Sequence, residues 1–145
     1  MEDFKVNYYA DHVKFMLFLL DNRNEINTLE SCSGKFSCVT EEALLRDIGS
    51  RAYYASYLSA RDKLVSANML ADQASVNHTG VKNKLSRQFK TFLMELKEIR
   101  EKADYDTKTI FNFPQSTTTT KLYPLVRLES IMGRFVNGTA NSITP

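Results

Sequence analysis

The chain has 145 residues, of which 43% are hydrophobic, so it is long enough for one domain with a buried core and too short for two. Five glycines and three prolines are few for this length, which favours long helices over a sandwich of short strands. The net charge of +2 does not demand a nucleic-acid partner, but its distribution permits one: residues 1–50 hold 5 basic and 9 acidic side chains, and residues 51–145 hold 14 and 8.

A first helix is predicted from Glu2 to about Asn22, because its apolar residues are dense enough for most of the helix to be buried. These residues are Phe4, Tyr8, Val13, Phe15, Leu17, Phe18, Leu19 and Leu20. Residues 22–39 then break the pattern with asparagine, serine and glycine, which predicts a long connecting loop.

The second predicted helix begins at Thr40, whose hydroxyl can accept an unpaired backbone N–H, while Glu41 and Glu42 suit the positive end of the helix dipole. It continues to about Asn68. Small residues recur along it, and they would let a neighbouring helix approach closely. They are Gly49, Ala52, Ala55, Ser56, Ser59 and Ala60. We expect this helix to be the central one.

A third helix is predicted from Asn77 or Thr79 to Ala103, because its apolar residues follow spacings of three and four. They are Val81, Leu85, Phe89, Phe92, Leu93, Leu96, Ile99 and Ala103. The opposite face is basic and has two interpretations, a solvated face or a track for a phosphate backbone. Its cations are Lys82, Lys84, Arg87, Lys90, Lys97, Arg100 and Lys102.

Residues 104–115 are expected to form an extended connection, and residues 116–120 to lead into a last helix with Pro124 in its first turn or at a kink. The apolar face of this helix holds Leu122, Leu125, Leu128, Ile131, Met132 and Phe135. The sequence thus predicts an all-α fold, an up-and-down bundle of four main helices that forms one domain at residues 1–136. A small, polar tail at residues 137–145 is expected to be flexible.

The sequence also bears on location and cofactors. Its longest nearly apolar run, residues 15–20, is far shorter than the roughly 20 residues that cross a bilayer. Glu2 and Asp3 stand where a secretory signal would carry basic residues, so we expect a cytoplasmic protein that binds no membrane. Cys32 and Cys38 have neither a second cysteine pair nor a nearby histidine to complete a zinc site, which favours two free thiols over a disulfide or a metal site. We expect no metal and no cofactor.

Three motifs occur in order along the predicted second and third helices. Residues 51–64 read RAYYASYLSARDKL, residues 78–81 read HTGV, and residues 100–105 read REKADY. Together they resemble HEPN domains over roughly residues 40–136. Each motif alone is weak, but the three at helical spacing are moderately specific.

The resemblance implies a bundle of four helices and a ribonuclease-like site. In active members of the family, an arginine and a following histidine of two subunits meet at a dimer interface, where the imidazole transfers protons and the guanidinium steadies the phosphate. Arg51 matches the arginine. Leu58 stands at the histidine position and can neither donate nor accept a proton, and Ala52 replaces the polar residue that usually follows the arginine.

Three functions stay open at this point. The first is a catalytically degenerate HEPN-like protein that binds RNA or a nucleotide, or regulates a cognate protein partner, in a toxin–antitoxin or phage-defence system as the resemblance implies. The second is an active, metal-independent ribonuclease toxin that uses Arg51 with His78 or a tyrosine. The third is a protein interaction module without a nucleic-acid role. The small residues of the second helix predict a homodimer through that helix and its neighbour.

Several residues carry these hypotheses. Arg51 is either paired with Asp47 or the region of Asp104, or free to contact phosphate. His78 is either a structural cap or a substitute acid or base, and His12 is expected to be structural. The predicted nucleic-acid contacts are Arg51, Lys82, Lys84, Arg87 and Lys90. A polar anchor that ties the third helix to the second is predicted from Arg100, Asp104, Tyr105 and Tyr54.

Overall fold

The fold is all-α. The computed structural model describes residues 2–29, 33–34, 37–71, 77–106, 108 and 123–145, and the regular structure of these residues is entirely helical, which confirms the predicted class. The helices are α1 (Glu2–Asp21), α2 (Arg23–Thr28), α3 (Cys38–Ser66), α4 (His78–Lys84), α5 (Arg87–Tyr105), α6 (Tyr123–Asn137) and α7 (Ala140–Ile143). Cys32 and the connection at residues 109–122 lie outside the described residues.

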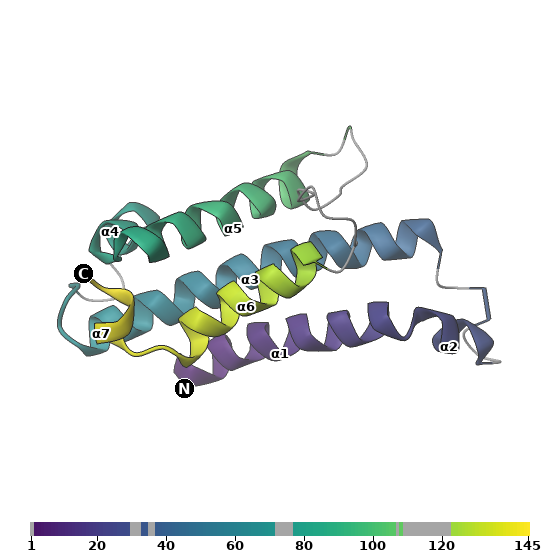
Figure 1. Cartoon of the computed structure of the whole chain (residues 1–145), viewed down its shortest axis with the longest axis horizontal. Coiled ribbons are helices and arrows are strands. Elements are labelled where there is room, and N and C mark those ends of the chain that lie inside the picture. Colours follow the sequence, from purple (N-terminus) through teal and green to yellow (C-terminus); the bar gives the residue numbers. More distant parts are fainter. Residues whose placement is uncertain (1, 30–32, 35–36, 72–76, 107, 109–122) are drawn as a thin grey trace.

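The long helix α3 is the centre of the molecule. It has 29 residues and packs against α1, α5 and α6, while α1 also contacts α6. Figure 1 shows these four helices lying lengthwise, with successive ones pointing in opposite directions. Within the described residues, none of the helices combines the length and the apolarity that crossing a bilayer requires.

The small residues of α3 explain how three helices reach it. Ala52, Ala55 and Ala60 are completely buried, and Ser56 and Ser59 are at most 2% exposed. Both serine hydroxyls are satisfied, because Ser56 Oγ donates to the Ala52 carbonyl and Ser59 Oγ to that of Phe135, each at 2.9 Å. The small residues therefore pack α3 against its own neighbours, and the prediction that they form a dimer interface is wrong.

The start of α3 lies earlier than predicted. Ser37 is the N-cap, and its side chain accepts the backbone N–H of Thr40 at 3.4 Å. Thr40 therefore lies inside the first turn and receives the cap instead of providing it. The predicted loop at residues 22–39 is also interrupted, because α2 follows α1 after the single residue Asn22.

The predicted third helix is divided into α4 and α5. Asn77 caps α4 as expected, since its side chain accepts the Gly80 N–H at 2.8 Å. At Leu85 the backbone turns extended, and the Ser86 side chain then caps α5 by accepting the Phe89 N–H. A serine that can cap a new helix offers the backbone an alternative to continuing the old one.

The C-terminal residues pack against the core. Pro124 lies in the first turn of α6, as predicted. Thr139 and Ser142 cap α7 reciprocally, and Ile143 is completely buried. The Ile143 carbonyl accepts the backbone N–H of Ser86 at 2.9 Å. The prediction of a flexible tail at residues 137–145 is therefore wrong, because one buried apolar side chain and a capped turn anchor this segment.

The first helix is less buried than predicted. Its inward side contributes Val13, Met16 and Leu20 to the core. Tyr8, Phe15 and Phe18 instead face outward and are 53%, 58% and 57% exposed. The blurred periodicity of α1 thus reflects apolar residues on two sides of the helix, only one of which packs inside.

Candidate functional site

Arg51 is engaged by a neighbour on its own helix. Its Nε donates to Asp47 Oδ1 at 3.3 Å, and its guanidinium carbon lies 5.3 Å from the centre of the Tyr9 ring on α1. The side chain is 39% exposed. Of the two pairings that the sequence left open, the structure shows the one with Asp47, since Asp104 pairs with Arg100.

His12 joins the same carboxylate from the other side. Its Nε2 lies 3.2 Å from Asp47 Oδ2, so one carboxylate bridges an imidazole on α1 and a guanidinium on α3. Both side chains are partly open to solvent, His12 at 33% and Asp47 at 42%. We call His12, Asp47 and Arg51 the bridged triad. An imidazole near a guanidinium suits proton transfer at a phosphate.

Sequence reasoning missed the role of His12. The residue lies 35 positions from Asp47, and no spacing rule for a single helix links two residues so far apart. The usable signal was the scarcity of histidine, since the chain has two.

Leu58, which the resemblance sets at the histidine position, cannot transfer a proton. It is partly buried and packs against the core. The seven-residue spacing from Arg51 places it two turns along the same side of α3. Leu58 therefore presents only a hydrocarbon side chain at this position of α3.

His78 is held by two tyrosines. Its ring stacks parallel to that of Tyr57, with centres 4.0 Å apart, and its Nδ1 is hydrogen-bonded to the Tyr53 hydroxyl. Although the residue as a whole stays exposed, desolvation of the ring lowers the pKa of His78, and the charges of Arg100 and Lys97 lower it further. The ring is therefore biased toward its neutral form.

Arg51 and His78 are not brought together. Arg51 contacts Asp47 and Tyr9, whereas His78 contacts Tyr53 and Tyr57. Burial also raises the pKa of the Tyr53 hydroxyl, which makes it a poor proton donor. The combination of Arg51 with His78 has no geometric support, although a tyrosine, Tyr9, does lie beside Arg51.

The residues of the predicted polar anchor lie together. Arg100 Nε is 3.2 Å from Asp104 Oδ2, and Arg100 Nη2 donates to the Tyr105 hydroxyl at 3.0 Å. The guanidinium also lies 5.2 Å from the centre of the Tyr54 ring. Because Ser50 Oγ donates to Asp104 at 3.3 Å, this cluster links the end of α5 to α3.

A pocket of about 230 Å³ opens beside His78. It is lined by Tyr53, His78, Thr79, Lys82, Leu93, Met94, Lys97, Glu98 and Glu101. Two lysines face two glutamates there, so the lining has no excess of either charge. Across the described part of the chain, no group of His, Cys, Asp or Glu side chains is arranged to hold a metal ion.

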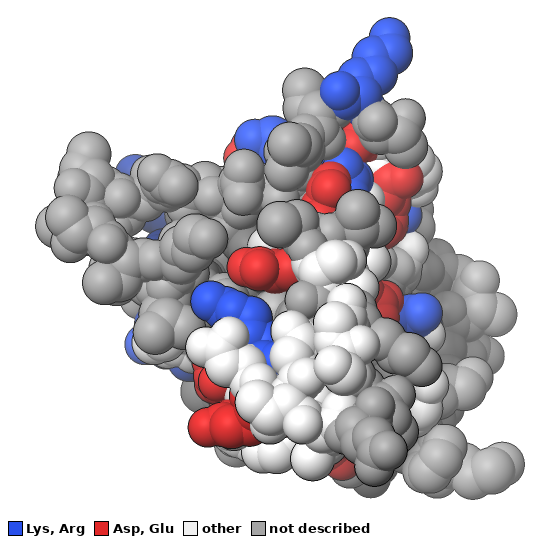
Figure 2. Space-filling model, turned by 90° about the vertical axis from the view of Figure 1, so that its right-hand side faces the viewer, with Lys and Arg blue, Asp and Glu red and all other residues white. Residues whose placement is uncertain are grey.

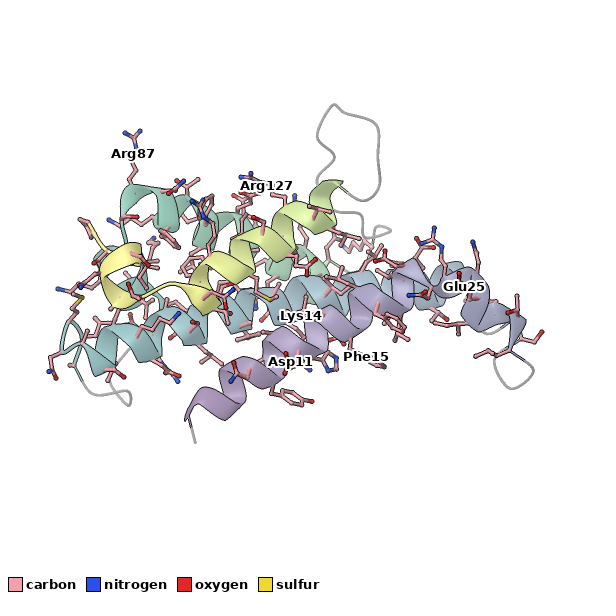
Figure 3. The ribbon with its side chains drawn as sticks, turned by 60° about the horizontal axis from the view of Figure 1, so that its bottom comes forward. Asp11, Lys14, Phe15, Glu25, Arg87 and Arg127 are labelled. Carbon is pink, nitrogen blue, oxygen red and sulfur yellow. The ribbon has the colours of Figure 1, made fainter. Side chains whose placement is uncertain are left out.

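The predicted nucleic-acid contacts separate into two places. Arg51 belongs to the bridged triad, whereas Lys82, Lys84, Arg87 and Lys90 lie where α4 meets α5. We call these four the basic junction. Among the described residues, none of the four takes part in an ion pair. Figure 3 shows Arg87 standing away from the body of the molecule at the start of α5.

Along the rest of α5, by contrast, several charged side chains form ion pairs. Lys97 lies 3.7 Å from Glu101, and Glu95 binds Arg127 of α6 at 2.8 Å. Figure 2 views the end of the molecule that carries α2, opposite the basic junction, and the described acidic and basic side chains are interspersed there. Four of the five cations of the predicted stripe that form no ion pair among the described residues thus lie at its start, and the fifth, Lys102, lies near the other end of α5. No family model, curated protein or solved structure matches this chain, so its likeness to HEPN domains depends on the three motifs alone.

Proposed function

We propose that this chain is a HEPN-like four-helix protein that binds RNA and does not cleave it at an arginine–histidine site of the usual kind. The observation that carries the proposal is the basic junction, four cations within nine residues that form no ion pair among the described residues. As the motifs imply, we place it in a toxin–antitoxin or phage-defence system.

Unpaired cations favour a polyanionic ligand over a neutral one. A lysine or arginine already paired with a carboxylate must give up that partner to bind phosphate, whereas the side chains of the basic junction need not. Lys84 and Arg87 are exposed, and Lys82 and Lys90 are half-buried, so their charges are held near the corner between two helices. Binding of phosphates there releases counterions, which makes affinity depend on salt.

The same geometry supports binding without cleavage. General acid–base catalysis contributes about 10²–10⁴ in rate, and it needs a proton carrier at the reacting phosphate. Leu58 cannot carry a proton, and His78 is fixed between tyrosines away from Arg51.

A pair of charge-reversed variants tests the binding site. Lys84→Glu/Arg87→Glu changes the basic junction, and Lys102→Glu/Lys108→Glu makes the same change in net charge at exposed positions near the other end of α5. We expect the first variant to bind labelled single-stranded RNA at least ~10-fold more weakly at about 0.15 M salt, with a shallower salt dependence by roughly 0.7 per lost phosphate contact.

The control variant should stay close to the wild type. Equal weakening in both variants would show that net charge alone attracts RNA and would contradict the proposed site. A wild type that binds no RNA at low salt would favour an interaction module instead.

One observation favours a second function, a ribonuclease that uses the bridged triad. His12 could supply the imidazole that Leu58 lacks, because Asp47 holds it close to Arg51. The same RNA assay, run with EDTA, separates the two functions. Cleavage that is lost in Arg51→Ala and His12→Ala but kept in His78→Ala would establish the enzyme and overturn binding alone.

A further inference from the structure

The exposed side of α1 carries an aromatic surface that the fold does not use. Tyr8, Phe15 and Phe18 are each more than half exposed. With 100° between successive residues, Tyr8, Asp11, Lys14, Phe15 and Phe18 fall within an arc of about 120°. We call these five residues the α1 face. Figure 3 is turned to show this side of the helix, with Asp11, Lys14 and Phe15 labelled.

The exposed area is large enough to need an explanation. Three aromatic side chains that are about half exposed leave on the order of 300 Å² of mostly apolar surface on one helix. The largest apolar patch on a typical monomer is of this order, and it is often a functional surface. By contrast, Met94 on α5 and Val126 on α6 each have no second exposed large apolar residue within one turn of their own helix.

The charges within the α1 face indicate what binds it. Asp11 and Lys14 are both exposed, and within the described residues neither forms an ion pair. The bordering bridged triad adds the opposite charges of Arg51 and Asp47. A polyanion or an anionic membrane would need an excess of cations here, and the described residues of this surface provide none.

We propose that the α1 face binds the α1 face of a second copy of this chain, with the two helices antiparallel. A two-fold axis at the level of residues 12 and 13 brings Asp11 of each copy opposite Lys14 of the other. The same register sets Tyr8 of one copy beside Phe18 of the other and both Phe15 rings near the axis. One surface that carries both charges on either side of an aromatic centre is self-complementary, as a two-fold contact requires.

This contact is independent of the proposed RNA binding, because the basic junction lies on other helices. It also replaces the dimer interface that the small residues of α3 suggested, since those residues are buried within one chain.

Sedimentation equilibrium of the full chain tests the contact. The wild type should have about twice the 16.6 kDa mass of one chain. Phe15→Glu should shift it to a monomer, with dimerisation weakened at least ~100-fold, because a carboxylate would be buried at the axis. Val126→Glu, which places the same charge at a residue of similar exposure on α6, should remain a dimer. Circular dichroism confirms that both variants stay folded.

Charge exchange tests the antiparallel register. Asp11→Lys and Lys14→Asp each set like charges opposite each other twice, so each variant should dimerise roughly 10-fold more weakly. An equimolar mixture of the two should recover dimerisation, because every pair in the mixed dimer has opposite charges. The double variant Asp11→Lys/Lys14→Asp should recover it too.

Three outcomes would overturn the proposal. They are a wild type that stays monomeric at 100 µM or more, a dimer unaffected by Phe15→Glu, and a mixture of the two charge variants no tighter than either alone. If Phe15→Glu abolished RNA binding without changing the mass, the α1 face would bind RNA instead.

Discussion

The two tyrosine rings beside His78 restrict what its imidazole can do. Tyr53 accepts or donates at Nδ1, Tyr57 covers one face, and the positive charges of Arg100 and Lys97 oppose protonation. Protonation of this ring is therefore less favourable in the folded chain than in the unfolded chain. His78 therefore serves the fold best when it is neutral.

The stability of the protein should consequently fall in mild acid. The pKa of His78 is lower in the folded state than its usual value of 6.5, so below that pH the unfolded chain binds more protons. The His78 contribution is present above pH 6.5 and is lost as the pH falls through the folded pKa. His78→Phe keeps the stacking without the titration, so in urea unfolding it should lose less stability than the wild type between pH 7.5 and pH 5.5. An equal loss in both proteins would contradict this account.

The sequence predicted the residue contacts that follow helical spacing. Arg51 with Asp47 and Arg100 with Asp104 are both four residues apart on one helix, and the structure shows both pairs. His12 escaped prediction because its partner belongs to another helix. Spacing along a helix fixes which side chains share a face, but the packing of two helices decides which faces meet.

Short elements depend on contacts that local sequence does not encode. The break between α4 and α5 follows from the Ser86 cap, but the backbone N–H of Ser86 is satisfied by Ile143, at the far end of the chain. The helix α7 has four residues and could not form alone. Its small and polar composition predicted disorder, whereas a single buried side chain holds it in place.

Ile143 should therefore contribute more to the free energy of unfolding than its place near the end of the sequence suggests. Ile143→Ala removes a completely buried side chain beside Ser86, and it should lower the free energy of unfolding by about 2–5 kcal/mol. Asn141→Ala in the same helix is exposed and should stay within about 0.5 kcal/mol of the wild type. Urea titrations of both variants make the comparison. Equal stabilities would show that the tail does not pack as described.

For the whole molecule, the sequence identified the class and the central helix. Three of its four main helices were placed within a few residues, because long apolar patterns determine the identity of a helix. The sequence alone could not show which neighbour the small-residue face of α3 packs against. A stripe of small residues permits close approach but does not say whether the neighbour belongs to the same chain.

A larger side chain on that stripe tests where it packs. Ala55→Leu should destabilise the monomer by about 1–3 kcal/mol, because three methyl-sized additions have no room among packed helices. Ala67→Leu, at the exposed end of α3, should change little. The loss caused by Ala55→Leu should not depend on protein concentration in urea titrations. A concentration-dependent loss would return these residues to a dimer interface.

The central helix α3 also donates hydrogen bonds to the carboxyl ends of α5 and α6. Arg46, near its start, donates to the carbonyls of Ala103 and Asp106 at 2.9 and 2.8 Å, and Lys63, near its end, donates to those of Phe135 and Val136. Arg46 thus binds the carboxyl end of α5 and Lys63 that of α6, and the two cations lie near opposite ends of α3. Sliding either neighbour by one turn, about 5.4 Å, would carry its terminal oxygens out of reach. Both cations therefore oppose any sliding of α5 and α6 along their axes, because such a shift would break their hydrogen bonds to the terminal carbonyls.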